Sequence, residues 1–78
     1  LQPLLDYDAG HHADLVETLF CYLKNNGSVK AVADEMFIHK NTIVYRMSKI
    51  KELLQADLEL GEERMAYYLA CLIVRKNH

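Results

Sequence analysis

Apolar residues recur three and four positions apart along most of this chain, a spacing that places them on one face of an α-helix. Residues 11–24 show the pattern clearly, and Asn25-Asn26-Gly27 would end that helix because glycine suits a left-handed cap. A weaker helical segment is expected at residues 1–7, with Ala9-Gly10 interrupting it. No stretch alternates in the manner of a strand, so the sequence predicts an all-α fold, a small bundle of four or five helices.

Residues 28–54 are predicted to form two helices joined by a very short turn. Ser28 is suited to cap the first helix, and only Ile38 and His39 separate it from the second, so the two must cross steeply, as in a helix-turn-helix. The first helix has an apolar face made of Val29, Val32, Ala33, Met36 and Phe37. The second, at about residues 39–54, begins at a cap formed by His39 or Asn41, and its apolar face is made of Ile43, Met47, Ile50 and Leu54.

The last predicted helix, residues 62–75, is apolar nearly all round. One face would be enough to pack on the rest of the chain, and 78 residues are too few to enclose the whole helix. We expect Met65, Leu69, Leu72 and Ile73 to form the buried face. The opposite residues would then form a contact with a second copy or with another domain, and these are Tyr67, Tyr68, Cys71 and Val74.

Charge is distributed unevenly along the chain, although its sum is only −2. Residues 1–27 carry four acids against one base, and residues 52–78 carry five acids against three bases. Residues 28–51 carry five bases against two acids, so this is the only cationic part of the chain. Positive charge is therefore concentrated in the predicted helix-turn-helix, where it would favour a polyanion.

Long polar side chains stand at the start of the second helix of this unit. Such side chains, on a helix that fits the major groove, can form hydrogen bonds with base edges and phosphates. The candidates for base contact are Lys40, Asn41, Thr42, Tyr45 and Arg46, with His39 at the helix start and Lys49 and Lys30 as candidates for the DNA backbone. On charge alone a solvated helix face is equally compatible, and Thr42 could instead cap the helix.

Other chemistry finds little support in the sequence. His11 and His12 stand beside Asp8 and Asp14, but adjacent histidines point to different faces and lack the spacing of metal ligands. There is no glycine-rich phosphate loop and no nucleophile paired with a base, so we expect no enzyme activity, no metal and no cofactor. Two cysteines without metal-ligand spacing and the lack of a long apolar run favour a cytoplasmic protein with reduced thiols and no membrane span.

Three motifs together identify a family. They are L-x-x-Y-L-x-x-N-G at residues 19–27, F-I-H-K-N-T-I-V-Y-R-M at 37–47 and E-x-L at 52–54. The chain resembles, from about residue 4 to 74, the C-terminal helix-turn-helix domain of the PucR family of bacterial transcription regulators, whose reading helix is similar to that of Fis-type activators. This resemblance implies that residues 1–78 are one DNA-binding domain, the C-terminal fragment of a longer regulator with an upstream sensory domain.

The resemblance further implies sequence-specific binding to double-stranded DNA by the run from His39 to Arg46. The apolar helix at residues 62–75 in turn favours a homodimer in the full-length protein. Phe37 departs from the general helix-turn-helix pattern, because a glycine is common at that turn position. The alternative function is a helical protein-interaction or dimerisation module that uses the apolar helix at residues 62–75, with the basic face merely solvated.

Overall fold

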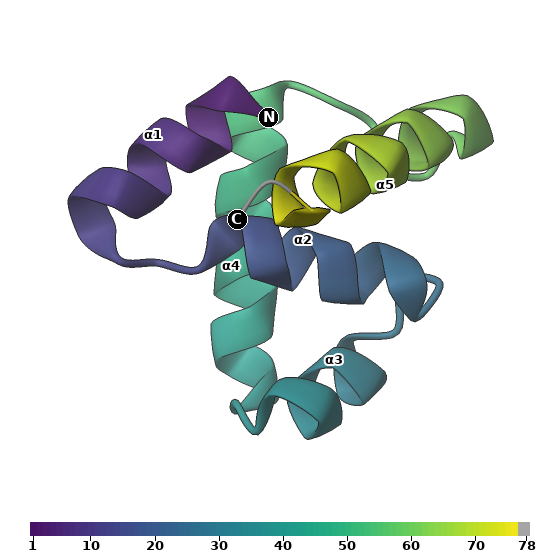
Figure 1. The fold of residues 1–78 in the computed structure, drawn as a ribbon. Helices are drawn as coiled ribbons and strands as arrows, with labels where there is room; N and C mark the ends of the chain where they lie inside the picture. Colours follow the sequence, from purple (N-terminus) through teal and green to yellow (C-terminus); the bar gives the residue numbers. More distant parts are fainter. Residues whose placement is uncertain (77–78) are drawn as a thin grey trace.

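The computed structural model describes residues 1–76, and these form five helices (Figure 1). In chain order the helices are α1 (Gln2–His11), α2 (Leu15–Lys24), α3 (Val29–Met36), α4 (Lys40–Leu54) and α5 (Gly61–Lys76). The described residues contain no strand, and the prediction of an all-α bundle is confirmed. The predicted helix-turn-helix corresponds to α3 and α4.

Helices α2 and α4 form the centre of the bundle. α2 packs against all four other helices, α4 packs against α1, α2 and α3, and α5 packs against α2 alone (Figure 1). The apolar faces expected on α2 and α4 are largely confirmed, since each supplies several core side chains. The most completely buried apolar side chains are Leu4, Leu15, Leu19, Val32, Ile43, Ile50, Leu58 and Cys71. Burying one large aliphatic side chain of this set contributes roughly 1.5–3 kcal/mol.

The junction between α1 and α2 differs from the prediction. α1 continues through Ala9-Gly10 to His11, so these small residues do not interrupt it. α2 begins at Leu15 rather than near His11, because the Asp8 carboxylate accepts hydrogen bonds from the backbone N–H groups of Leu15, at 2.8 Å, and Val16, at 3.1 Å. The first backbone N–H groups of a helix have no acceptor within the helix, and a carboxylate placed there accepts their hydrogen bonds. The end of α1 therefore fixes the start of α2.

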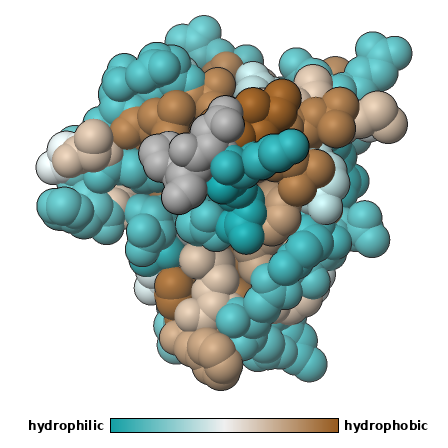
Figure 2. All heavy atoms as spheres, viewed as in Figure 1, coloured by the Kyte–Doolittle hydropathy of each residue, from teal (hydrophilic) through white to brown (hydrophobic). Residues whose placement is uncertain are grey.

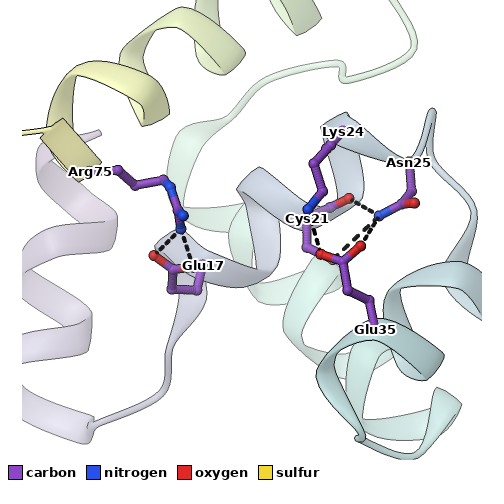
Figure 3. A network of polar contacts seen from close by, with 6 residues as sticks. All are labelled: Glu17, Cys21, Lys24, Asn25, Glu35 and Arg75. Carbon is purple, nitrogen blue, oxygen red and sulfur yellow. Dashed lines mark hydrogen bonds and ion pairs between the residues drawn. The ribbon is translucent and has the colours of Figure 1, made fainter.

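Polar contacts at the surface of α2 fasten α3 to the centre (Figure 3). Glu35 of α3 accepts hydrogen bonds from Lys24 Nζ, at 2.6 Å, and from Cys21 Sγ, at 3.2 Å. The Lys24 ammonium holds the pKa of the Glu35 carboxyl below its ordinary value. Burial, and then the hydrogen bond to Glu35, raise the pKa of the Cys21 thiol.

A second set of contacts fastens α5 to α2. Arg75 donates a hydrogen bond of 2.6 Å to Glu17 (Figure 3). It also lies over the ring of Phe20, with 4.2 Å between the guanidinium carbon and the ring centre. Phe20 also stacks on Tyr68, with ring centres 5.5 Å apart. These contacts hold the aromatic face of α5 against the bundle.

Candidate nucleic-acid interface

The turn between α3 and α4 is set by two residues with different backbone conformations. Phe37 ends α3 in the left-handed region, with φ of 58° and ψ of 42°. His39 is extended, with φ of −61° and ψ of 143°, and α4 begins at Lys40. Ser28 caps α3 as predicted, since its Oγ accepts a hydrogen bond of 3.2 Å from the Ala31 N–H. The chain thus changes direction over a few residues, and α3 runs across α4 rather than along it (Figure 1).

Phe37 does not belong to the apolar face of α3, and the prediction that it does is wrong. Its side chain is 95% exposed, because the left-handed backbone conformation directs it away from the helix that it ends. For a residue with a Cβ, the left-handed backbone conformation is roughly 1–2 kcal/mol less favourable than the right-handed one. Glycine has no Cβ and avoids this strain, which is why it is common at such positions. The departure from the general helix-turn-helix pattern is therefore a backbone position that glycine would suit better.

His39 is the cap of α4. Its Nδ1 accepts a hydrogen bond of 3.1 Å from the backbone N–H of Asn41, so the side chain of Asn41 is left for other partners. A ring nitrogen that accepts carries no proton, so the N–H donor of this ring is Nε2. Because His39 is exposed, this N–H donor is accessible at the start of α4.

The start of α4 presents an exposed polar surface, which we term the reading face. It includes four of the predicted residues, and Tyr45 among them is 65% exposed. Val44 and Ser48, which were not among the predicted site residues, are exposed on the same face. The reading face consists of Lys40, Asn41, Thr42, Val44, Tyr45 and Ser48. The expected exposure of the four predicted residues is confirmed, and their contact with DNA stays a prediction.

Arg46 and Lys49, which the sequence predicts as DNA contacts, do not lie on the open face of α4. Arg46 is half-buried, and its Nη1 donates a hydrogen bond of 3.2 Å to Thr18 Oγ1 of α2. Lys49 Nζ lies 5.2 Å from the ring centre of Tyr7 in α1 and 3.8 Å from a carboxylate oxygen of Glu52. Both positions stand closer to the buried stripe than Tyr45 does, because each helical residue is rotated by 100° from the one before it.

Two more cations are exposed near this unit. Lys30, a predicted contact with the DNA backbone, lies on α3, and that contact stays a prediction. Lys51 lies two turns beyond Val44 on α4. Lys51 was not among the predicted site residues. Ile43 and Ile50 are fully buried and mark the inward side of α4. Helical periodicity then places Lys51, Val44 and Ser48 away from that side, so their exposure could be predicted.

The two faces of α5 are the reverse of the prediction. Cys71 is fully buried, and Tyr67, Tyr68 and Val74 are partly buried against the core, so these four do not form an open interface. Burial raises the pKa of the Cys71 thiol to about 11. The exposed face consists instead of the residues expected in the core, Met65, Leu69, Leu72 and Ile73. Both faces are apolar, so periodicity alone did not distinguish them, and the stacking of Tyr68 on Phe20 decides the orientation.

Among residues 1–76 no three His, Cys, Asp or Glu side chains are grouped in a way that could hold a metal ion. Within that range, too, no helix combines the length and the apolar character needed to cross a membrane.

Comparison with known proteins agrees with the geometry of α3 and α4. Residues 15–73 match the family described as the PucR C-terminal helix-turn-helix domain. The proline-responsive transcriptional activator PutR of Bacillus subtilis is 36% identical over 69 residues, which are 88% of this chain and 17% of that protein. The purine catabolism regulatory protein of Bacillus subtilis is 34% identical over 61 residues, covering 78% of this chain and 12% of that protein.

A third relative, the carbohydrate diacid regulator of Escherichia coli, is 36% identical over 56 residues, covering 72% of this chain and 14% of that protein. This chain thus spans less than a fifth of the length of each of these relatives. No solved structure matches it. The family match covers most of the chain, including α3, the turn and all of α4, and the chain therefore belongs to the family of PucR C-terminal helix-turn-helix domains.

Proposed function

We propose that this domain binds double-stranded DNA sequence-specifically, with the reading face of α4 in the major groove. The observation that carries the proposal is the polar start of α4. Lys40, Asn41, Thr42 and Tyr45 are all exposed there, on a helix whose opposite face is locked in the core by Ile43 and its neighbours. A rigid helix that presents hydrogen-bonding side chains at its start is the element that reads base edges in helix-turn-helix proteins.

The four predicted residues of the reading face each offer a different contact. The Asn41 amide can donate to and accept from one adenine edge, and the Lys40 ammonium can donate to the acceptors of guanine. Thr42 can reach a base through its hydroxyl or its methyl group, and Tyr45 offers a hydroxyl one turn further along the groove. We assign sequence preference to these four, with Asn41 as the principal reader.

Arg46, Lys49 and Lys30 are assigned to the DNA backbone. Arg46 uses one donor on Thr18, and a guanidinium has five, so it can hold a phosphate while α2 fixes its position. The Nε2–H group of His39 is a further phosphate donor at the start of α4. Phosphate contacts supply affinity and register, and they make binding depend on salt.

The wider role follows from the family. Relatives named as transcriptional activators or regulators support DNA binding in transcription control as the activity of this domain, which is not the work of an enzyme. The chain covers less than a fifth of the relatives cited, and we propose that it works within a longer cytoplasmic regulator whose upstream part senses a signal. The regulator acts as a homodimer in this proposal.

The test is selection of bound sequences from a random DNA pool, followed by titration of the selected site with Arg46→Ala and Thr18→Val chains at several salt concentrations. Arg46→Ala should lower affinity for all sequences and reduce the salt slope by about one. Thr18→Val is the matched control, since it removes the internal partner of Arg46 while leaving the guanidinium in place. The dependence of its DNA affinity on salt should equal that of the unchanged chain. An unchanged affinity and slope for Arg46→Ala would refute the assigned role.

The second candidate function is a helical protein-interaction module, and the exposed apolar row on α5 favours it. In that case the basic charge of residues 28–51 is only solvated. Binding to random-sequence DNA at low ionic strength separates the two functions, because neutralised phosphates give a salt-sensitive affinity even without a specific site. Salt-sensitive binding supports the DNA-binding function, and its absence supports the interaction module.

A further inference from the structure

The exposed face of α5 is an apolar row that the bundle leaves open. Met65, Leu69, Leu72 and Ile73 are between 41% and 67% exposed, and they follow one another at helical spacing along one side of the helix. In the view of Figure 2, hydrophobic residues gather over α5, at the upper right of the molecule. We term this row the α5 stripe. Four large apolar side chains in one continuous row are more than scattered surface residues.

The α5 stripe has symmetry about Leu69. Going outward from Leu69 along α5, Ala66 and Leu72 lie three residues away on either side, and Met65 and Ile73 lie four away. Seven residues away on either side stand Glu62 and Lys76, which have opposite charge. All of these residues are exposed. The stripe therefore has apolar residues around its centre, an acid at one end and a base at the other.

A second copy of this chain, turned end for end, fits this arrangement. If two α5 helices lie antiparallel with a two-fold axis at Leu69, Met65 is level with Ile73 of the second copy, and Glu62 is level with its Lys76. Small Ala66 is then level with Leu72 of the second copy, which allows the helices to approach closely. The helix ends also match, because the positive N-terminal end of each dipole meets the negative C-terminal end of the other.

We infer that the α5 stripe is the surface through which two copies of this domain associate, antiparallel and two-fold symmetric about Leu69. α5 packs only against α2, and it has no contact with α4, so association through α5 leaves the reading face open. Arg75 is already held by Glu17 and Phe20 and takes no part. The stripe is short, so we expect a weak dimer with a dissociation constant on the order of 0.1 mM for the isolated domain.

The first test is the sedimentation of the 78-residue chain over a range of concentrations at low salt. The unchanged chain should pass reversibly from monomer to dimer. Leu69→Glu places two carboxylates at the two-fold axis and should stay monomeric, with unchanged helix content as evidence of folding. The control, Phe37→Glu, changes an equally apolar but more exposed side chain outside α5 in the same way and should still dimerise. A chain that remains monomeric at about 1 mM, or a control that abolishes the dimer, overturns the proposal.

Charge reversal tests the antiparallel register. Glu62→Lys alone, or Lys76→Glu alone, places like charges level with each other twice in the dimer, and each should weaken it about fivefold to tenfold at low salt. Mixing the two variant chains should restore the affinity, because in the mixed dimer both pairs are again of opposite charge. A parallel dimer would instead bring Glu62 beside Glu62 and Lys76 beside Lys76 in the unchanged chain. Either single reversal would then still leave like charges together, so single variants that dimerise as well as the unchanged chain would refute the antiparallel register. Failure of the mixed pair to recover refutes the register, whether or not the domain binds DNA.

Discussion

α4 and α5 have nearly the same length, 15 and 16 residues, but present opposite chemistry to solvent. α4 packs against three helices and exposes a polar surface at its start, while α5 packs against α2 alone and exposes an apolar row. Polar side chains can exchange water for base edges and phosphates, whereas an apolar row is stabilised only by another apolar surface. The domain therefore has two outward surfaces of different chemistry, and in our proposal DNA binds to the first and a second copy to the other.

α2 makes this separation possible. It contacts both α4 and α5, through Thr18 to Arg46 on one side and through Glu17 to Arg75 on the other. Each of the two helices is thus fastened to a common support rather than to the other. We expect changes on the open face of either helix to leave the other one in place.

The largest expected effect concerns which face of α5 is open. In a Cys21→Ser background, the Cys71 thiol should react with a thiol reagent at pH 8 at least about a hundredfold more slowly than the thiol introduced by Leu69→Cys. The pKa of Cys71 is raised from the ordinary value of 9.0 to about 11, so its reactive thiolate is about a hundredfold rarer, and its burial slows the reaction further. Labelling rates followed by mass spectrometry measure the difference.

The pH dependence gives the control for this measurement. The protonated thiol is favoured in the folded state, so labelling of Cys71 should keep accelerating as the pH rises from 9 toward 11, whereas labelling at residue 69 should level off near the ordinary thiol pKa. Equal rates at the two positions at pH 8 would mean that the orientation of α5 is wrong, and with it the α5 stripe.

The next largest effect is expected at Asn41. Asn41→Ala removes a bidentate contact and should weaken binding to the selected DNA site by about 1–3 kcal/mol, or roughly tenfold to a hundredfold. Binding to random DNA should change little, since an amide carries no charge. Fluorescence anisotropy with both DNAs measures the two affinities. An equal loss on both would indicate that Asn41 supports the fold of α4 rather than sequence preference.

A smaller effect is expected at the turn that orients α4. Phe37→Gly should raise the free energy of unfolding by about 1 kcal/mol, because glycine adopts a positive φ without strain and the exposed ring loses almost no packing. Chemical denaturation measures the change. Phe37→Ala is the matched control, since it removes the ring but keeps the Cβ, and it should not give this gain. A destabilised Phe37→Gly chain would contradict the left-handed turn.

The smallest effect separates the cations of the two helices. Lys40→Ala should reduce the slope of DNA affinity against salt by about one, because one positive charge that neutralises the DNA at the start of α4 is lost. Lys76→Ala removes the same charge from α5 and should leave the slope for a single half-site unchanged. Titrations at four or five salt concentrations give both slopes. Equal reductions would show that net charge, and not the position of Lys40, governs binding.

Most of the fold could be predicted because sequence periodicity and caps agree. Ile43, Met47 and Ile50 mark the buried side of α4, and Ser28 marks the start of α3, all as the structure has them. The start of α2 could not be predicted, because its cap comes from Asp8 through a contact that exists only after folding. Local patterns do not record which distant carboxylate will satisfy a helix start.

The site was predicted in part for a related reason. Exposure of Lys40, Asn41 and Tyr45 follows from the α4 pattern, but Arg46 and Lys49 lie at its edge, where partners on α2 and α1 decide their orientation. α5 is apolar on both sides, so hydropathy leaves its orientation open, and aromatic stacking on α2 decides it. The orientation of side chains at the border between a polar and an apolar face cannot be predicted without the tertiary structure. The same holds for the orientation of a helix that has no such border.

The most direct test of the separation between α4 and α5 is the affinity of Leu69→Glu for a single half-site of the selected DNA, measured beside Asn41→Ala. We predict that Leu69→Glu binds the half-site as tightly as the unchanged chain and with the same salt slope, while Asn41→Ala binds about tenfold or more weakly. A loss of half-site affinity in Leu69→Glu equal to that in Asn41→Ala would contradict the assignment of DNA to α4 and of the second copy to α5.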